Sequence, residues 1–364
     1  MQKTCLVRRA GAVGLVVTAA ATVPASAQDE GGRRLSGVLS QSVEAGSNLA
    51  FRPGESDLGA RSVTTLGLGF LTETRTQSFA LDATVIARSK VIGDEDSTAD
   101  DLRVLPTVEL TYGIEGPRTR LGLEGYYRLD AVDEDTEAQE YLVAGTISRQ
   151  LTRGLSANAR LGYRVDGAEN DGVLDDTASY FFTLGTDYAG QLWQVGASAG
   201  VRLFEDEVRP TGEVHFSREM PRGEIGGFVG VSSSRDADLA VVGGLEVDYA
   251  LNRTNRLNGS LDQSISVGDE GEDQLRTTAR LAYVRDLTSR SSAQLGASVS
   301  LRNGLGDSGI DNLPGAGLDL GYSYELTERA DLNLGYEYRF EEEATGPSSQ
   351  SHLISVGITL PFDL

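Results

Sequence analysis

Cysteine, lysine and histidine are scarce in this chain of 364 residues. The single cysteine, Cys5, leaves no pair for a disulfide bond and no cluster for a thiolate metal site. Basic residues are also in deficit, with 32 lysines and arginines against 54 aspartates and glutamates, and this argues against a nucleic-acid-binding protein, which needs a basic face. Long apolar runs are missing as well, and the mean hydropathy of −0.22 leaves no room for a bundle of membrane-spanning helices.

The first 27 residues have the three-part layout of a secretory signal peptide. Basic residues come first, a run of small and apolar residues follows over 10–23, and an A-x-A cleavage site ends at Ala27. We predict cleavage after Ala27, which removes Cys5 and leaves residues 28–364 without a cysteine. An uncleaved anchor helix is the alternative.

From Leu35 onward the sequence repeats short stretches in which apolar and polar residues alternate. In 330–340, for example, leucine and aromatic residues occupy every second position and polar residues or glycine lie between them. Alternation at period two predicts strands with one apolar and one polar face. The pattern is weakest at 35–44 and around 203–218, so sixteen strands is the alternative to eighteen. The predicted strands are 35–44, 61–71, 77–88, 102–112, 119–129, 139–149, 155–165, 178–188, 192–203, 211–218, 224–233, 239–251, 256–266, 274–285, 292–302, 315–325, 330–340 and 351–362.

Short and longer connections alternate along the chain without a break in phase. The longer ones, such as 93–101 and 166–176, are mostly acidic, whereas short ones such as 115–119 are not. A soluble β-sandwich has no reason to segregate loop length and charge in this way, but a transmembrane barrel has short periplasmic turns and longer outer loops. We therefore predict an all-β fold: a single closed antiparallel transmembrane β-barrel over residues 28–364, of about 18 strands, with short periplasmic turns and longer acidic extracellular loops.

Aromatic residues gather near strand ends on the apolar face of these strands. Their amphipathic rings suit a lipid–water boundary. These residues are Tyr180, Tyr188, Trp193, Tyr283, Tyr324 and Tyr338.

The last strand resembles the C-terminal insertion signal of bacterial outer-membrane barrels, with Gly357, Leu360 and Phe362 at the matching positions. It departs from that signal in the two residues that follow Phe362. Together with the signal peptide and the series of hairpins, it makes the whole chain resemble the β-barrel porin families of Gram-negative bacteria. The resemblance implies insertion by the barrel-assembly machinery and residence in the outer membrane, in contact with lipid and lipopolysaccharide.

The polar face of the strands carries many charged residues of both signs. A dry core could hold them only as ion pairs, whereas a barrel of sixteen or more strands encloses a water-filled lumen that accommodates them. Pairing across neighbouring strands is the alternative role for each residue. The pore-lining candidates are Asp82, Glu109, Arg120, Glu124, Arg128, Arg160, Arg164, Arg202, His215, Glu246, Asp262, Arg276, Arg280, Asp319, Glu337 and Arg339; Asp248 shares their parity.

Patterns that point to catalysis or metal binding are weak. His215 next to Glu213 permits general-base chemistry, but a hydrogen-bonded wall residue is the favoured interpretation. The stretch 196–200 matches G-x-S-x-G but lies inside an alternating strand with no helix after it, unlike a nucleophile elbow. Acidic segments such as 94–96 and 269–273 lack the spacing of a calcium loop, although they could bridge cations loosely. We expect no catalytic residue, no metal site and no cofactor.

The sequence therefore favours a passive outer-membrane channel for small hydrophilic solutes, with a mild cation preference at its acidic mouth. One alternative is a polysaccharide-export barrel in which Arg160, Arg164, Arg276 and Arg280 form a ladder for sugar acids. A barrel-embedded hydrolase that uses His215 and an adhesin are weaker alternatives. The third long loop, 130–140, is too short to fold inward and narrow the pore, so either the lumen is wide or side chains narrow it. The oligomeric state stays open.

Overall fold

The computed structural model describes residues 32–49, 51–92, 102–131, 137–170, 173–204, 207–234, 239–267, 273–305, 312–343 and 346–363. The predicted signal peptide and its cleavage site at Ala27 lie outside the described residues. Within them, no helix is long and apolar enough to cross a membrane. The strands are β1 Arg33–Ser47, β2 Leu58–Glu73, β3 Gln77–Ile92, β4 Leu102–Glu115, β5 Thr119–Ala131, β6 Glu137–Gln150, β7 Leu155–Asn170, β8 Val173–Ala189, β9 Trp193–Leu203, β10 Val208–Met220, β11 Gly223–Ser233, β12 Leu239–Ala250, β13 Asn255–Val267, β14 Asp273–Thr288, β15 Ser291–Gly304, β16 Leu313–Thr327, β17 Ala330–Glu341 and β18 Ser349–Asp363.

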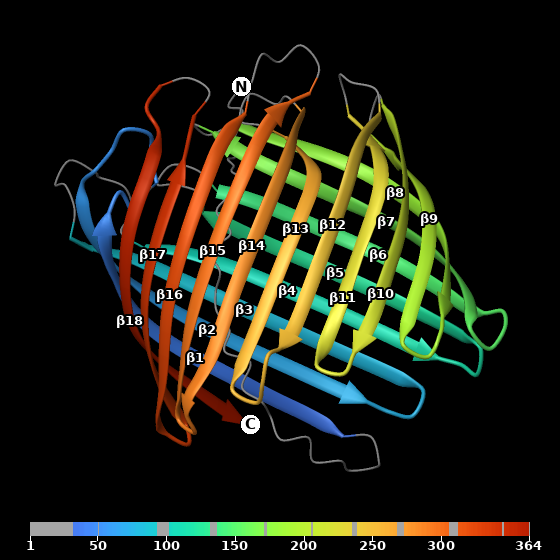
Figure 1. Cartoon of the computed structure of the whole chain (residues 1–364), viewed down its shortest axis with the longest axis horizontal. Helices are drawn as coiled ribbons and strands as arrows, with labels where there is room; N and C mark the ends of the chain where they lie inside the picture. Colours follow the sequence, from blue (N-terminus) through green and yellow to red (C-terminus); the bar gives the residue numbers. More distant parts are fainter. Residues whose placement is uncertain are drawn as a thin grey trace, which may run out of the picture.

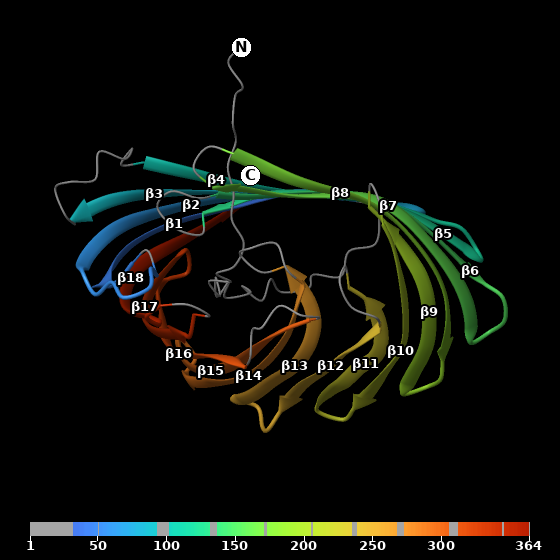
Figure 2. The same cartoon turned by 90° about the horizontal axis from the view of Figure 1, so that it is seen from above.

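These strands form one closed antiparallel barrel, which confirms the predicted fold class and the prediction of eighteen strands. Each strand pairs with its neighbours in sequence, and β1 also pairs with β18, with Val43 opposite Val356 near the middle of the seam. Figure 2 shows the strands as a ring around an interior, and in Figure 1 the strands of the near wall cross those of the far wall at an angle, as tilted barrel strands do. The alternative of sixteen strands is wrong, because the two weakly patterned stretches form β1 and the β9–β10 hairpin.

Several strands extend beyond their predicted ends at the side of the longer loops. The clearest case is the connection predicted at 166–176, where the ladder between β7 and β8 continues to Asn170 and Val173. The alternation of apolar and polar residues stops at about Val165, but the backbone hydrogen bonds do not. A barrel strand that extends beyond the apolar layer no longer needs one apolar face. The alternation of apolar and polar residues therefore ends before the hydrogen-bonded ladder does.

The outer face of the barrel is apolar. Leu161, Val229 and Val299 are each about 60% exposed, at 61%, 60% and 59%. The buried hydrophobic residues in the described part of the chain are only Leu105, Ala144 and Leu313. Exposing so continuous an apolar belt to water would be unfavourable by about 25 cal/mol for each Å². The face is suited to lipid, in which a closed barrel leaves no backbone edge unsatisfied.

Aromatic residues border this belt on both sides. Tyr188 and Trp193 flank the β8–β9 turn with their ring centroids 5.3 Å apart, and Tyr163 and Tyr180 meet further up the wall at 4.8 Å. Tyr180 and Tyr188 share one face of β8 and lie roughly 27 Å apart along the strand, at about 3.4 Å per residue. At a strand tilt of about 40° this spacing corresponds to about 21 Å along the barrel axis, close to the apolar band of about 25 Å that such a barrel presents to a membrane.

The residues of the predicted insertion signal lie in the closing seam. Phe362 is opposite Gly37 of β1, and a Cβ atom at Gly37 would collide with the Phe362 ring. Leu360 is 41% exposed on the outer face, and Gly357 is opposite Ser42. The ring therefore lies flat against the first strand, while recognition by an assembly machinery stays a prediction.

Candidate functional site

The candidate site is the inner wall of the barrel. Side chains that are directly opposite on paired strands share a face, so the register shows which residues lie together. Asp82 is opposite Glu109, Asp319 is opposite Glu337, and like charges therefore meet directly across the ladder. Like charges in these positions repel one another unless water screens them.

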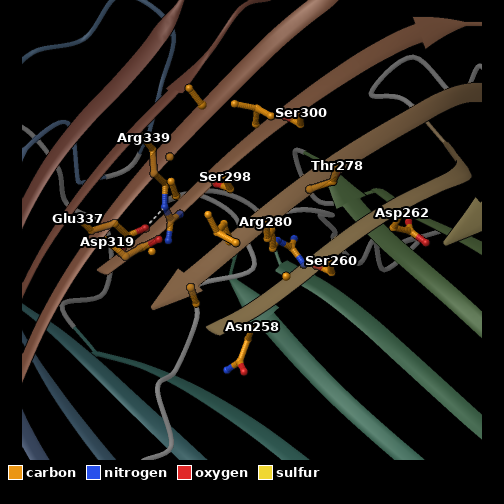
Figure 3. A pocket seen from close by; sticks show the side chains of 18 of the residues that line it. Asn258, Ser260, Asp262, Thr278, Arg280, Ser298, Ser300, Asp319, Glu337 and Arg339 are labelled. Atoms are coloured by element: carbon orange, nitrogen blue, oxygen red, sulfur yellow. Dashed lines mark hydrogen bonds and ion pairs between the residues drawn. The ribbon is translucent and has the colours of Figure 1, made fainter. Parts of the chain in front are cut away.

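A cavity of about 850 Å³ opens on the wall formed by β12 to β17. Eight residues placed on the polar face from the sequence line it: Glu246, Asp248, Asp262, Arg276, Arg280, Asp319, Glu337 and Arg339. Neutral polar residues lie between these charges, and Figure 3 shows several of them on neighbouring strands: Asn258, Ser260, Thr278, Ser298 and Ser300. The arrangement offers hydrogen-bond donors, acceptors and charges of both signs to whatever fills the cavity.

Two arginines on this wall face the cavity from the same strand. Arg276 and Arg280 are four residues apart on β14 and so share a face. Among the described residues, neither forms an ion pair, and Arg280 lies between two serines, Ser260 and Ser298, in the register. Arg339, by contrast, pairs with Glu337 on its own strand (Figure 3).

The wall formed by β5 to β8 differs, because its predicted pore-lining residues are paired. Arg160 forms an ion pair with Glu124 two strands away, and its guanidinium carbon lies 5.0 Å from the centre of the Phe181 ring. Arg164 contacts Glu140 at 3.0 Å and Asp166 at 2.8 Å. For these residues the alternative role given at the sequence level, pairing across neighbouring strands, describes the geometry.

Three further predicted residues lie elsewhere on the wall. Arg128 pairs with Asp130 on its own strand near the outer end of β5. Arg120 pairs with Glu115 at 2.6 Å beside the short β4–β5 turn, where both side chains are exposed. Arg202 of β9 is opposite Arg209 and forms no ion pair within the described part of the chain.

His215 is held by Asp187, a residue that the sequence alone did not single out. The His215 Nε2 atom is 2.8 Å from Asp187 Oδ1, and Asn158 Nδ2 donates a hydrogen bond of 2.6 Å to Asp187 Oδ2. Glu213, the expected neighbour, is 4.0 Å from His215 Nδ1. Gly196 lies between Asp187 and His215 in the register, and a Cβ atom there would collide with both side chains. No local sequence pattern indicates this contact, because it depends on the register of β8, β9 and β10.

The arrangement around His215 contains a base and its orienting carboxylate but no described hydroxyl in hydrogen-bond contact with the ring. The G-x-S-x-G stretch lies inside β9, which continues as a strand to Leu203. Within the described ranges, no group of three or more His, Cys, Asp or Glu side chains could hold a metal ion. The acidic segments 94–96 and 269–272 lie outside those ranges.

Arginines also brace the end of the barrel that carries the longer loops. Arg209 at the start of β10 contacts Glu207 at 3.0 Å and reaches Asp273 of β14 at 3.3 Å, and Asp273 is 2% exposed. Arg302 of β15 contacts Glu341 of β17 at 3.2 Å. Both contacts pass over intervening strands, which sequence parity could not reveal because they depend on how the strand ends lean together.

Comparison with known proteins supports the fold assignment. No protein-family model matches the sequence, and no curated protein does. Among solved structures, the outer-membrane protein OpdK of Pseudomonas aeruginosa superposes with a TM-score of 0.55 at 14% identity, covering 92% of this chain and 99% of that one. OccK2 (OpdF) of the same organism gives 0.54 at 13% identity, with 92% and 100% covered. A BenF-like porin from Pseudomonas fluorescens Pf-5 gives 0.52 at 12% identity, with 92% and 99% covered.

These neighbours are outer-membrane porins, and the chain has their fold over almost its whole length. The resemblance to β-barrel porins of Gram-negative bacteria that the sequence suggested is therefore confirmed at the level of the fold. At 12–14% identity the similarity shows the fold and does not identify a transported solute.

Proposed function

We propose that the protein is an outer-membrane channel through which small hydrophilic solutes diffuse passively. The observation that carries this proposal is the pair of arginines, Arg276 and Arg280, that face a cavity of about 850 Å³ without an ion pair among the described residues. A charge without a partner is strongly unfavourable in a dry interior, where removing it from water costs several kcal/mol. The like charges that meet at Asp82 and Glu109 add to the same requirement. A water-filled lumen solvates the two arginines and screens the repulsion between the like charges.

The location follows from the exterior and from the ends of the chain. The apolar belt with its aromatic borders suits a bilayer, and the residues before Gln28 have the layout of an export signal. We infer that the mature chain is inserted into the outer membrane by the barrel-assembly machinery, with the longer loops facing lipopolysaccharide. The fold of the three porins described above supports this location.

A mild cation preference belongs to the same proposal. The chain carries a formal net charge of −22, and its acidic residues are concentrated in the longer connections. Such a mouth enriches cations within a Debye length of about 10 Å at 0.1 M salt. On the inner wall, arginines such as Arg276 and Arg280 offset part of the negative charge of the carboxylates that line the cavity, which keeps the preference mild.

Planar-bilayer recording of the purified protein tests the channel. We expect steady conductance steps, and under a salt gradient a reversal potential that indicates weak selectivity for cations. Liposome-swelling assays with sugars of graded size give the exclusion limit. A protein that inserts into the bilayer but stays closed at every voltage contradicts the proposal.

Two of the alternatives, the polysaccharide-export barrel and the hydrolase, find no specific support in the geometry. Of the four arginines that would form a ladder for acidic polysaccharides, Arg160 and Arg164 are engaged with carboxylates. Such pairing leaves only Arg276 and Arg280 available to a polymer. A hydrolase would need a nucleophile within reach of His215, and its hydrogen bond in the described part of the chain goes to Asp187.

A further inference from the structure

The segment between β1 and β2 contributes an aromatic side chain to the lumen. Phe51 lines the same cavity as the charged residues of β12 to β17, although it belongs to neither that wall nor any strand. The long strand connections were expected to matter only as an acidic mouth, and the third of them was expected to be too short to narrow the pore. The first connection reaches the cavity instead.

Asn48 holds this segment in place. Its side chain is 3% exposed, and its Nδ2 atom donates hydrogen bonds to the backbone oxygens of Arg52 at 2.7 Å and Gln350 at 3.1 Å. Its Oδ1 atom accepts a hydrogen bond of 2.8 Å from the backbone nitrogen of Arg52. Its backbone oxygen accepts one of 3.0 Å from Phe51 itself. Asn48 thus holds the backbone of Arg52 with its side-chain amide and that of Phe51 with its main-chain oxygen.

The segment is also joined to the connection between β17 and β18. The backbone nitrogen of Gly54 donates to the backbone oxygen of Ser348 at 3.3 Å. Gly54 has φ of 72°, and a Cβ atom there would lie 2.8 Å from Pro347 Cγ, so both the backbone conformation and the close approach favour glycine. The β1–β2 connection therefore contacts the β17–β18 connection, across the seam that closes the barrel.

The backbone at Phe51 is itself unusual. Its φ of 53° lies in the left-handed region, which bulky side chains rarely occupy. Such a conformation persists where surrounding contacts determine it, and Asn48 and its partners supply these contacts here. A conformation of this kind is characteristic of functional positions, because an unconstrained loop would relax out of it.

We propose that Phe51 is a specificity-determining residue, which narrows the lumen from the side of the β1–β2 connection and limits the size of the hydrated solutes that pass. The inference rests on the proposed channel function. A solute that crosses the cavity meets both the apolar ring of Phe51 and the polar wall around Arg280, because both line it. An apolar ring offers no hydrogen bond to replace those that a hydrated solute loses in a narrow passage, so it acts as a size limit.

Two substitutions at Phe51 test the proposal by single-channel recording and liposome swelling. We expect F51A to raise the conductance about 1.5-fold and to admit larger sugars, and F51W to lower both, because conduction follows the narrowest cross-section. The matched control is F228A. Phe228 is an aromatic residue that faces inward on β11, but its ring lies over Gly244 and is not among the residues that line the cavity. F228A should leave the conductance unchanged.

A cysteine variant keeps the test independent of folding. Residues 28–364 contain no cysteine, so F51C and F228C each carry a single thiol in the mature chain. After insertion into the bilayer, a bulky thiol reagent should reduce the current through F51C by about half and leave the current through F228C and the wild type unchanged. N48A should raise the conductance as F51A does, because the segment loses its buried anchor.

The outcomes separate this inference from the proposed function. If the wild type conducts but F51A, F51W and reagent-treated F51C all behave as it does, Phe51 does not limit the lumen, although the protein is a channel. If the inserted wild type is silent, the channel function fails and this inference fails with it.

Discussion

The two walls of the lumen use the same residue types in different ways. On β5 to β8 the arginines are matched to carboxylates, as in Arg160 with Glu124 and Arg164 with Glu140 and Asp166. On β14 the arginines Arg276 and Arg280 face the cavity, Arg280 between two serines in the register and Arg276 between Ser264 and Arg302. The first wall holds charges that compensate one another, and the second presents charge to the cavity. Inward charge by itself therefore does not identify a residue that contacts solute.

The largest expected effect is on ion selectivity, from reversing the charges of the unpaired wall. R276E together with R280E should raise the permeability ratio of potassium to chloride severalfold, because the cavity lining, which already holds more carboxylates than arginines, becomes strongly acidic. Reversal potentials under a salt gradient measure the ratio. The neutral double variant R276Q with R280Q should fall between the wild type and the reversed form.

The control for that experiment comes from the paired wall. E124Q together with R160Q removes an ion pair and leaves the net charge of the lumen unchanged, so the reversal potential should stay at its wild-type value. A shift as large as that of the β14 variants would show that the two walls do not differ in the way described.

The sequence indicated which charged residues line the two walls. It did not indicate that the inward arginines are paired on β5 to β8 and, within the described residues, unpaired on β14. Alternation placed Arg160 and Arg280 on the same polar face, and the alternating lengths of the connections gave the closed barrel. Partners depend on register between strands, however, and no local pattern encodes it. His215 contacts Asp187, which is 28 positions away, in preference to Glu213, two positions away, because Asp187 and His215 flank Gly196 in neighbouring strands.

The ends of the strands and the segment around Phe51 show a second kind of limit. Outside the apolar layer both faces of a strand are polar, so the β7–β8 ladder continues where hydropathy indicates a loop. The position of Phe51 follows from hydrogen bonds of Asn48 that join residues 302 positions apart, such as Asn48 and Gln350. Contacts of this kind appear only once the barrel has closed.

The next largest effect is on stability, at the glycine between His215 and Asp187. G196A adds a Cβ atom whose nearest neighbours include Asp187 Oδ1 at 2.5 Å, so the carboxylate or the imidazole must move. We expect the free energy of unfolding to fall by about 1–3 kcal/mol, as for other overpacked sites. Thermal unfolding in detergent measures the change.

Gly122 supplies the matched control for that substitution. It also faces inward, but a Cβ atom there meets only Thr146 Cβ at 3.8 Å, which is ordinary contact. G122A should therefore unfold at the wild-type temperature. Equal destabilisation by G196A and G122A would mean that the contact between His215 and Asp187 makes no specific contribution to stability.

The smallest effect should come from the paired wall itself, with R164Q. This change removes the contacts of 3.0 Å with Glu140 and 2.8 Å with Asp166, but the Arg164 side chain is 34% exposed, and ion pairs in contact with water contribute about 1 kcal/mol or less. Unfolding by denaturant should shift only slightly, and the selectivity should move less than in R276Q, although each variant removes one positive charge from the lumen. The reason is position: Arg276 lines the cavity without an ion pair among the described residues, whereas two carboxylates already compensate the charge of Arg164. If R164Q changes selectivity as much as R276Q does, permeating ions interact equally with both walls. The ion pairs on β5 to β8 then do not reduce the effect of their arginines on those ions.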